Sequence, residues 1–77
     1  MAFQVVRIEM NDQGIVVERQ RTDPPFGRRE DAVAIAEFQA ALTDECAYDA
    51  KRGCWRAREG RRAFTFIIEP VPEGMAA

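Results

Sequence analysis

The sequence contains no histidine among its 77 residues. Histidine is the commonest general acid–base group, a frequent metal ligand and the usual side chain that changes charge near neutral pH. Its absence removes the usual catalytic pairs, in which a histidine activates a serine or cysteine nucleophile. We therefore expect a protein that is not an enzyme, with no catalytic residues and no cofactor.

Cysteine is also scarce, and only Cys46 and Cys54 are present. Secreted domains of this size usually carry four or more cysteines in a disulfide framework. We therefore expect free thiols and a cytoplasmic protein. Two thiolates without a histidine fall short of the four ligands of structural zinc, so no metal site is expected.

Long apolar runs are missing as well, and none approaches the ~20 residues that a membrane-spanning helix needs. Arg7 and Glu9 interrupt the apolar N-terminal stretch before a secretory h-region can form. We expect neither membrane association nor secretion. Lysine is nearly absent, with one lysine against ten arginines, and alanine is abundant. This composition is typical of a GC-rich coding genome and suggests a bacterial origin.

The overall composition indicates one soluble globular domain. Hydrophobic residues make up 47% and charged residues 31% of the chain, which is ordinary for a folded protein. We place the domain at residues 1–70. Pro70 and Pro72 end the last expected strand, so residues 71–77 are expected to be a flexible C-terminal tail.

Two β-strands are expected before the first prolines. Residues 3–10 alternate, with Val6, Ile8 and Met10 on one side, and residues 15–21 begin with β-branched side chains. The Asn-Asp-Gln-Gly turn at residues 11–14 joins them into a hairpin.

An amphipathic helix is expected from residue 28 to about residue 44. At 100° per residue, Ile35, Phe38 and Leu42 form one apolar stripe, which Cys46 would continue if the helix ran on. We expect this stripe to face the sheet. Under that assignment, Phe38→Ala would destabilise the fold by about 3–5 kcal/mol.

A second hairpin, of strands at residues 54–59 and 62–69, completes the expected fold. The prediction is an α+β domain in the order ββαββ, with a four-stranded, mainly antiparallel sheet and one helix packed on one face. The sequence leaves the strand order open. The expected core consists of Val6, Ile8, Ile35, Phe38, Leu42, Trp55, Phe64, Phe66 and Ile68.

The basic residues gather in one short segment. Residues 51–62 carry six of the eleven basic groups and one acid, a formal charge of +5, although the whole chain carries −2. The segment is a candidate site for nucleic acid or another polyanion, with a tryptophan or tyrosine available to stack on a base. Its candidate ligand residues are Lys51, Arg52, Arg56, Arg58, Arg61 and Arg62.

Two other interpretations of this segment remain open. The arginines can simply keep a hairpin soluble and discourage edge pairing, and a pI near 5.1 is low for a nucleic-acid-binding protein. An acidic protein partner is the other possibility.

The sheet face without a helix is the second candidate surface. One helix covers one face only, yet the expected strands place apolar residues on both sides. Leaving about five such side chains in water would lose on the order of 5–10 kcal/mol of stabilisation from apolar burial. We therefore expect an interaction module that forms a homodimer through this face. The candidate interface residues are Phe3, Val5, Ile15, Val17 and Ile67.

Overall fold

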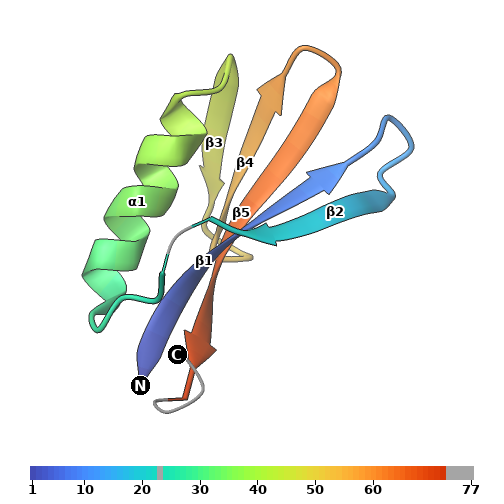
Figure 1. Cartoon of the computed structure of the whole chain (residues 1–77). Helices are drawn as coiled ribbons and strands as arrows, with labels where there is room; N and C mark the ends of the chain where they lie inside the picture. Colours follow the sequence, from blue (N-terminus) through green and yellow to red (C-terminus); the bar gives the residue numbers. More distant parts are fainter. Residues whose placement is uncertain (23, 73–77) are drawn as a thin grey trace.

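A computed structural model describes residues 1–22 and 24–72, which form one helix and five strands (Figure 1). The elements are β1 (Ala2–Met10), β2 (Val16–Arg21), α1 (Arg29–Ala41), β3 (Glu45–Asp49), β4 (Cys54–Glu59) and β5 (Arg62–Val71). All neighbouring strands are antiparallel, in the order β2-β1-β5-β4-β3. The two longest strands, β1 and β5, therefore lie side by side at the centre of the sheet.

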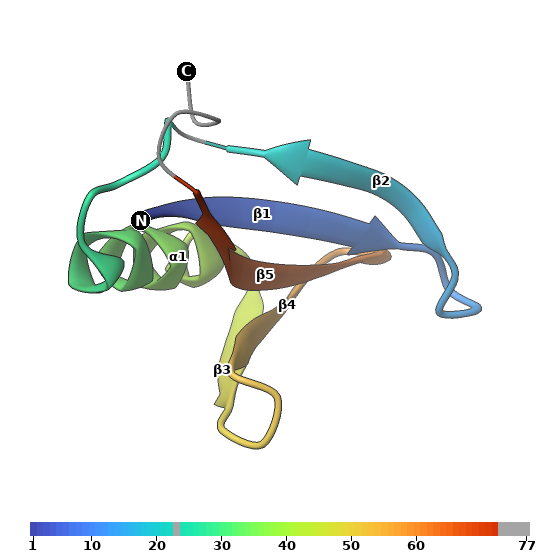
Figure 2. The same ribbon diagram turned by 90° about the horizontal axis from the view of Figure 1, so that it is seen from below.

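The predicted α+β class with one helix and an antiparallel sheet is confirmed, but the strand count and element order are wrong. The chain runs ββαβββ, and the additional strand is β3 at one edge. Figure 2 shows that the sheet twists strongly, with β3 and β4 at a steep angle to β1 and β2. Such a twist is the normal consequence of L-amino-acid strands.

The additional strand exists because the helix ends earlier than its apolar stripe predicts. The backbone N–H of Thr43 donates to the carbonyl of Ala40 at 3.1 Å, and its hydroxyl bonds the same carbonyl at 2.6 Å. The hydroxyl also lies 2.9 Å from the carbonyl oxygen of Glu45, across the turn. The chain is thereby turned away from the helix axis, and residues 45–49 pair with β4 instead of continuing α1.

The helix packs on the sheet through alanine, not through its large apolar residues. Ala32, Ala36 and Ala40 recur every four residues and are fully buried. Phe38 and Leu42, predicted as core, are 62% and 69% exposed. The sheet supplies the bulk through large aromatic side chains, so the facing helix must present small ones to fill the space between the layers without strain.

The side of β1 that faces the helix is the opposite of the predicted one. Val5 belongs to the core beneath α1 and lies opposite Ile68 of β5. Val6 is fully buried and Ile8 half-buried, but the strand alternation places both on the other face. The rest of the predicted core is correct: Trp55, Phe64 and Phe66 are buried, and Ile35 and Ile68 are partly buried against them.

Hydrogen bonds hold the first hairpin and the chain that follows it. The Asn11 side chain accepts from the backbone N–H of Gln13 and Ile15, and Gly14 adopts a positive φ of 78°. After β2 the chain returns to β1, where Phe3 and Phe26 exchange two backbone hydrogen bonds of 2.7 Å. This bridge ties the connection to β1 three residues before α1 begins.

The end of the predicted domain lies inside a strand. β5 runs to Val71, one residue beyond the predicted boundary at residue 70. Of the predicted tail at residues 71–77, residues 73–77 lie outside the described residues.

Candidate functional surfaces

The face of the sheet opposite α1, hereafter the open face, has an apolar centre. On this face β1 and β5 lie side by side, and their paired residues include Val6 with Ile67 and Ile8 with Thr65. Apart from the buried Val6 these side chains are half-buried. We call them the apolar strip: Val6, Ile8, Met10, Ala63, Thr65 and Ile67.

Arginines flank the apolar strip on both sides. On β2, Arg19 lies opposite Ile8 and Arg21 opposite Val6. On β4, Arg56 lies opposite Thr65 and Arg58 opposite Ala63. The open face therefore presents two pairs of arginines with the apolar strip between them.

One of these four arginines is neutralised within the chain. Arg19 of β2 forms an ion pair with Glu69 of β5, across the intervening β1. Arg21, Arg56 and Arg58 are exposed and form no ion pair with any described residue. The open face thus carries three cations that are free to meet an external anion.

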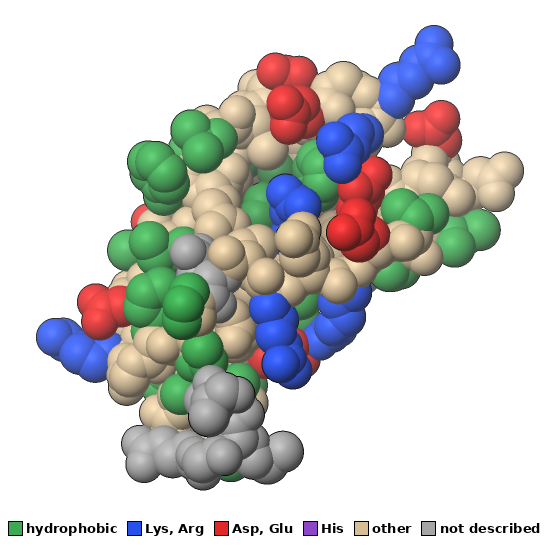
Figure 3. All heavy atoms as spheres, in the orientation of Figure 1, with side chains coloured by type: hydrophobic (Ala, Val, Ile, Leu, Met, Phe, Trp, Pro, Cys, Tyr) green, Lys and Arg blue, Asp and Glu red, His purple; other side chains and the backbone are tan. Residues whose placement is uncertain are grey.

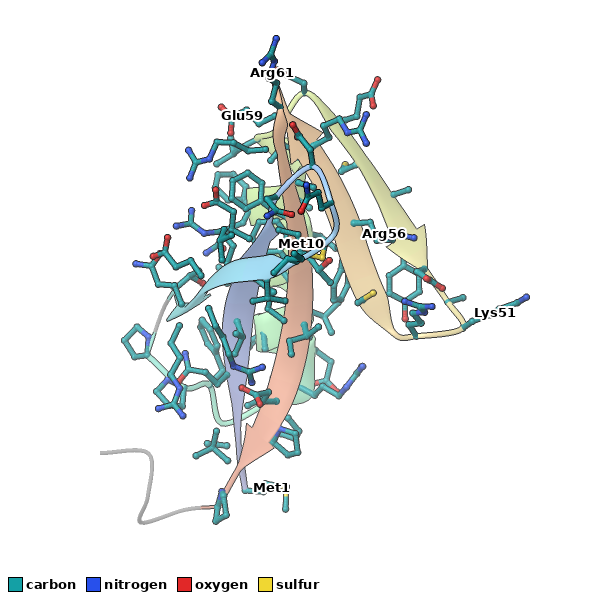
Figure 4. The ribbon with its side chains drawn as sticks, turned by 90° about the vertical axis from the view of Figure 1, so that its right-hand side faces the viewer. Met1, Met10, Lys51, Arg56, Glu59 and Arg61 are labelled. Carbon is teal, nitrogen blue, oxygen red and sulfur yellow. The ribbon has the colours of Figure 1, made fainter. Side chains whose placement is uncertain are left out.

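The open face is hollowed between β1 and the β3–β4 hairpin. A groove of about 470 Å³ includes Met10, Ala63, Arg56 and Arg58 in its lining, and Glu45 lies at its β3 side. Figure 4, in which the strands lie in front of α1, labels Met10 at the end of β1 and Arg56 on β4. Apolar and cationic side chains therefore share one shallow concave surface.

The predicted basic site does not form one patch. Lys51 and Arg52 lie in the β3–β4 turn, whereas Arg61 lies in the β4–β5 turn at the far end of β4, as Figure 4 shows. Only Arg56 and Arg58 face the open side, and Arg62 lies on the helix side, paired with Glu9. The β4 strand between the two turns is six residues long, so the two ends are about 20 Å apart.

The aromatic side chains are on the opposite face from Arg56 and Arg58. Trp55 is only 6% exposed, and Phe64 and Phe66 are buried beside it beneath α1. Tyr48 is exposed and contacts Trp55 with its ring tilted by 50°, at 4.9 Å between ring centroids. Of the tryptophan and tyrosine that the sequence suggested for base stacking, Trp55 is therefore buried, and the exposed Tyr48 lies on the face opposite Arg56 and Arg58.

The five predicted interface residues do not share one face. Val5 is fully buried beneath the helix, and Phe3, two residues away on β1, packs partly against the same core. Ile15 and Val17 are exposed near the tip of the β1–β2 hairpin. Only Ile67 lies on the apolar strip. The prediction failed because both sides of β1 are apolar, so alternation alone cannot say which side meets the helix.

A second groove, on the helix side, was not predicted. It occupies about 330 Å³ between the C-terminal end of α1 and the β1–β2 hairpin. In Figure 3 hydrophobic side chains gather over α1, and charged side chains lie over the strands beside it. We call this the helix-side groove, and its lining is Arg7, Gln20, Thr22, Gln39, Leu42, Thr43, Glu59, Phe64 and Phe66.

A charged pair lies next to this groove. Arg62 binds Glu9 at 2.7 Å, and the guanidinium groups of Arg62 and Arg7 lie 5.1 and 5.4 Å from the centre of the Phe64 ring. The hydrogen bonds from Arg62 lower the pKa of the Glu9 carboxyl, and the positive charges of Arg62 and Arg7 lower it further. The only sequence signal for this cluster was the charged alternation of Arg7 and Glu9 within an apolar strand.

Comparison with known proteins gives no relative. No family model, no curated protein and no solved structure matches this chain. Within the part of the chain that the structure describes, no helix combines the length and apolar character required to cross a membrane. Among residues 1–22 and 24–72, no three cysteine, aspartate or glutamate side chains gather as metal ligands would.

Proposed function

We propose that this chain is a non-catalytic binding module whose open face binds an acidic segment of a partner protein. The observation that carries this proposal is the apolar strip between two pairs of arginines. Protein interfaces commonly combine a desolvated apolar centre with a polar rim, and arginine is enriched in them. The open face has this arrangement, and its three unpaired arginines supply the charge that an acidic segment would meet.

Self-association through the same face, which the sequence suggested, is less well supported by the charges. In an aligned face-to-face dimer with a two-fold axis along the strands, the arginines of β2 lie over those of β4 in the second copy. With the two-fold axis perpendicular to the strands and in the plane of the sheet, each arginine pair lies over the same pair of the second copy. Both arrangements bring like charges together, which opposes association.

Nucleic acid is also a weaker candidate for this face. Binding of single strands usually combines cationic contacts to the backbone with stacking on aromatic side chains. The open face offers arginines, but the aromatic residues of β4 and β5 lie beneath the helix. A polyanion could then be held only by charge, without the apolar strip contributing.

We further propose that the protein works in the cytoplasm. Cys46 is an exposed free thiol and Cys54 a buried one, and both belong to adjacent strands without forming a disulfide. Free thiols persist in reducing compartments, whereas oxidising compartments favour disulfides.

The test uses two short peptides of equal length and charge, one alternating Glu and Leu and the other alternating Glu and Ser. Backbone amide shifts of the ¹⁵N-labelled protein report where each peptide binds. We expect shifts in β1, β4 and β5, with the Glu-Leu peptide binding more tightly because its leucines cover the apolar strip. Shifts confined to residues outside the open face, or no binding of either peptide, would overturn the proposal.

Variants with matched changes in charge distinguish binding of the peptide at the open face from non-specific electrostatic attraction. The double variant Arg56→Ala/Arg58→Ala should lower affinity for the Glu-Leu peptide by about tenfold, the scale expected for loss of a charged hydrogen bond. Lys51→Ala/Arg52→Ala removes the same charge at the turn and should change affinity much less.

The same proteins decide between the three partner classes. A single-stranded oligothymidylate that binds better than the peptides, with a steep salt dependence, would favour nucleic acid instead. Sedimentation equilibrium showing a dimer that the Glu-Leu peptide cannot dissociate would favour self-association. We expect a monomer in sedimentation and weak oligonucleotide binding.

A further inference from the structure

The helix-side groove has the construction of a small-ligand site, independent of the open face. Its floor contains Phe64 and Phe66, which are buried, and its rim includes Leu42, which is 69% exposed. Its volume of about 330 Å³ lies at the lower end of the range found for ligand pockets. An apolar group placed on this floor would also cover the exposed leucine.

Arg7 supplies a cation inside the groove. Its side chain donates a hydrogen bond to the amide oxygen of Gln20, and its guanidinium lies 5.4 Å from the centre of the Phe64 ring. The nearby carboxylate of Glu9 is held by Arg62 through two hydrogen bonds. Arg7 has no ion pair with any described residue.

Arg7 differs from a surface arginine because it is half-buried. A guanidinium next to aromatic rings is less exposed to water, and its interaction with an anion is less screened there. Its planar fork matches a carboxylate bidentately. The groove therefore combines a carboxylate-binding group with an apolar floor.

The positive and negative charges in the lining of the groove lie at opposite ends. Arg7 lies opposite Phe66, whereas Glu59 lies opposite Arg62, four residues away along β5. This separation is about 13 Å along the strand, so the acid in the lining is at the other end from Arg7. The hydrogen bonds to Glu9 raise the pKa of Arg62, and the negative charges of Glu9 and, to a smaller extent, Glu59 raise it further.

We propose that the helix-side groove binds a small monocarboxylate with an apolar or aromatic body. The carboxylate would pair with Arg7 beside Gln20, and the body would lie on Phe64 and Phe66 against Leu42. This binding is separate from the proposed partner surface, because the two sites lie on opposite faces of the sheet.

The test titrates the ¹⁵N-labelled protein with 3-phenylpropionate and, in parallel, with 3-phenylpropan-1-ol. Both probes carry the same aromatic body, and only the first carries a carboxylate. We expect amide shifts at the groove and about tenfold weaker binding of the alcohol, because it cannot pair with Arg7. Equal affinity for the two probes, or shifts located elsewhere, would overturn the proposal.

Variants of Arg7 define the role of its charge and shape. Arg7→Gln should weaken 3-phenylpropionate about tenfold while leaving the alcohol unchanged, and Arg7→Lys should give an intermediate affinity. Arg56→Gln removes one arginine from the open face and should change neither probe. If Arg7→Gln and wild type bind the acid equally, the proposed pairing is wrong.

Two variants at exposed positions keep the test decisive if substitution of Arg7 impairs folding. Leu42→Ser removes the apolar rim and should weaken both probes by a similar factor of a few. Glu59→Gln removes the acid from the lining and should leave the acid probe bound at least as tightly. Weaker binding of the acid probe to Glu59→Gln, or no effect of Leu42→Ser, contradicts the proposed orientation.

Discussion

The guanidinium of Arg62 donates two hydrogen bonds to the carboxylate of Glu9, from Nε to Oε2 at 3.1 Å and from Nη2 to Oε1 at 2.7 Å. The pair joins the start of β5 to the end of β1, although the two residues lie 53 positions apart in the sequence. Such bidentate pairing fixes geometry as well as charge. It ties the β4–β5 turn to the first hairpin beside Phe64, which lines the helix-side groove.

This pair makes part of the stability depend on pH. Folding lowers the pKa of Glu9 below its ordinary value of 4.5, so the ionised carboxylate stabilises the folded state above that pH. The contribution is lost as the pH falls through the lower, folded-state pKa. We expect the difference in unfolding free energy between wild type and Glu9→Gln to be constant near neutrality and to shrink in acid.

Urea unfolding of both proteins from pH 7 to about pH 3 measures this difference. Glu37→Gln is the control, because Glu37 is exposed on α1 and has no ion pair with a described residue. The difference in unfolding free energy between wild type and this control variant should not shrink in acid. A Glu9→Gln difference that grows in acid would show that the pair does not carry the pH dependence.

The alanine face of the helix should be far less tolerant than its large apolar residues. Ala36→Leu places extra atoms between tightly packed layers and should destabilise the fold by about 1–3 kcal/mol. Phe38→Ala should cost less than about 1 kcal/mol, because most of that ring is already in water. Chemical unfolding of the two variants checks the comparison, and the reverse ranking would mean that α1 packs through its other face.

The turn between β4 and β5 depends on a left-handed backbone conformation. Gly60 has φ of 60°, and a Cβ added there would meet no atom within 4 Å. Gly60→Ala should therefore destabilise by about 1–2 kcal/mol through backbone strain alone. Gly27→Ala meets equally open space without a positive φ and should not show this loss. Thermal unfolding of both variants tests the distinction, which fails if their losses are equal.

The ion pair between Arg19 and Glu69 should contribute little to stability. The two side chains are 52% and 35% exposed, so water and salt screen their attraction. A double-mutant cycle with Arg19→Ala and Glu69→Ala should give a coupling energy of about 0.2–1 kcal/mol. A coupling several times larger would indicate that this pair, lying across β1, also holds the sheet's curvature.

The sequence predicted the local elements better than their number. Alternation and turn residues located both terminal hairpins, and the helical period located α1, because these signals arise between near neighbours in the chain. The strand at Glu45–Asp49 was missed, because no strand was expected between the helix, placed at residues 28 to about 44, and the second hairpin, which was expected to begin at residue 54. The hydrogen bonds that end the helix near Thr43 have no equally strong signal in the sequence.

The candidate surfaces were harder to predict than the elements. The cluster of basic residues at 51–62 was visible in the sequence, but the alternation along β4 and β5 and the two turns distribute these residues over four places. Likewise, the helix-side groove gathers Arg7, Leu42 and Glu59 from three separate elements. Only the pairing of β1 with β5 and the docking of α1 bring such residues together.

The amino-acid sequence by itself determined the absence of histidine chemistry, the two hairpins, the position of the helix and the charged composition. The tertiary structure decided which side of each element became interior. Both faces of β1 and of α1 carry apolar residues, so the local pattern could not decide which face of each element would be buried. The bulky Trp55, Phe64 and Phe66 on the sheet decided between them, because close packing above large rings leaves room for alanine and excludes Phe38.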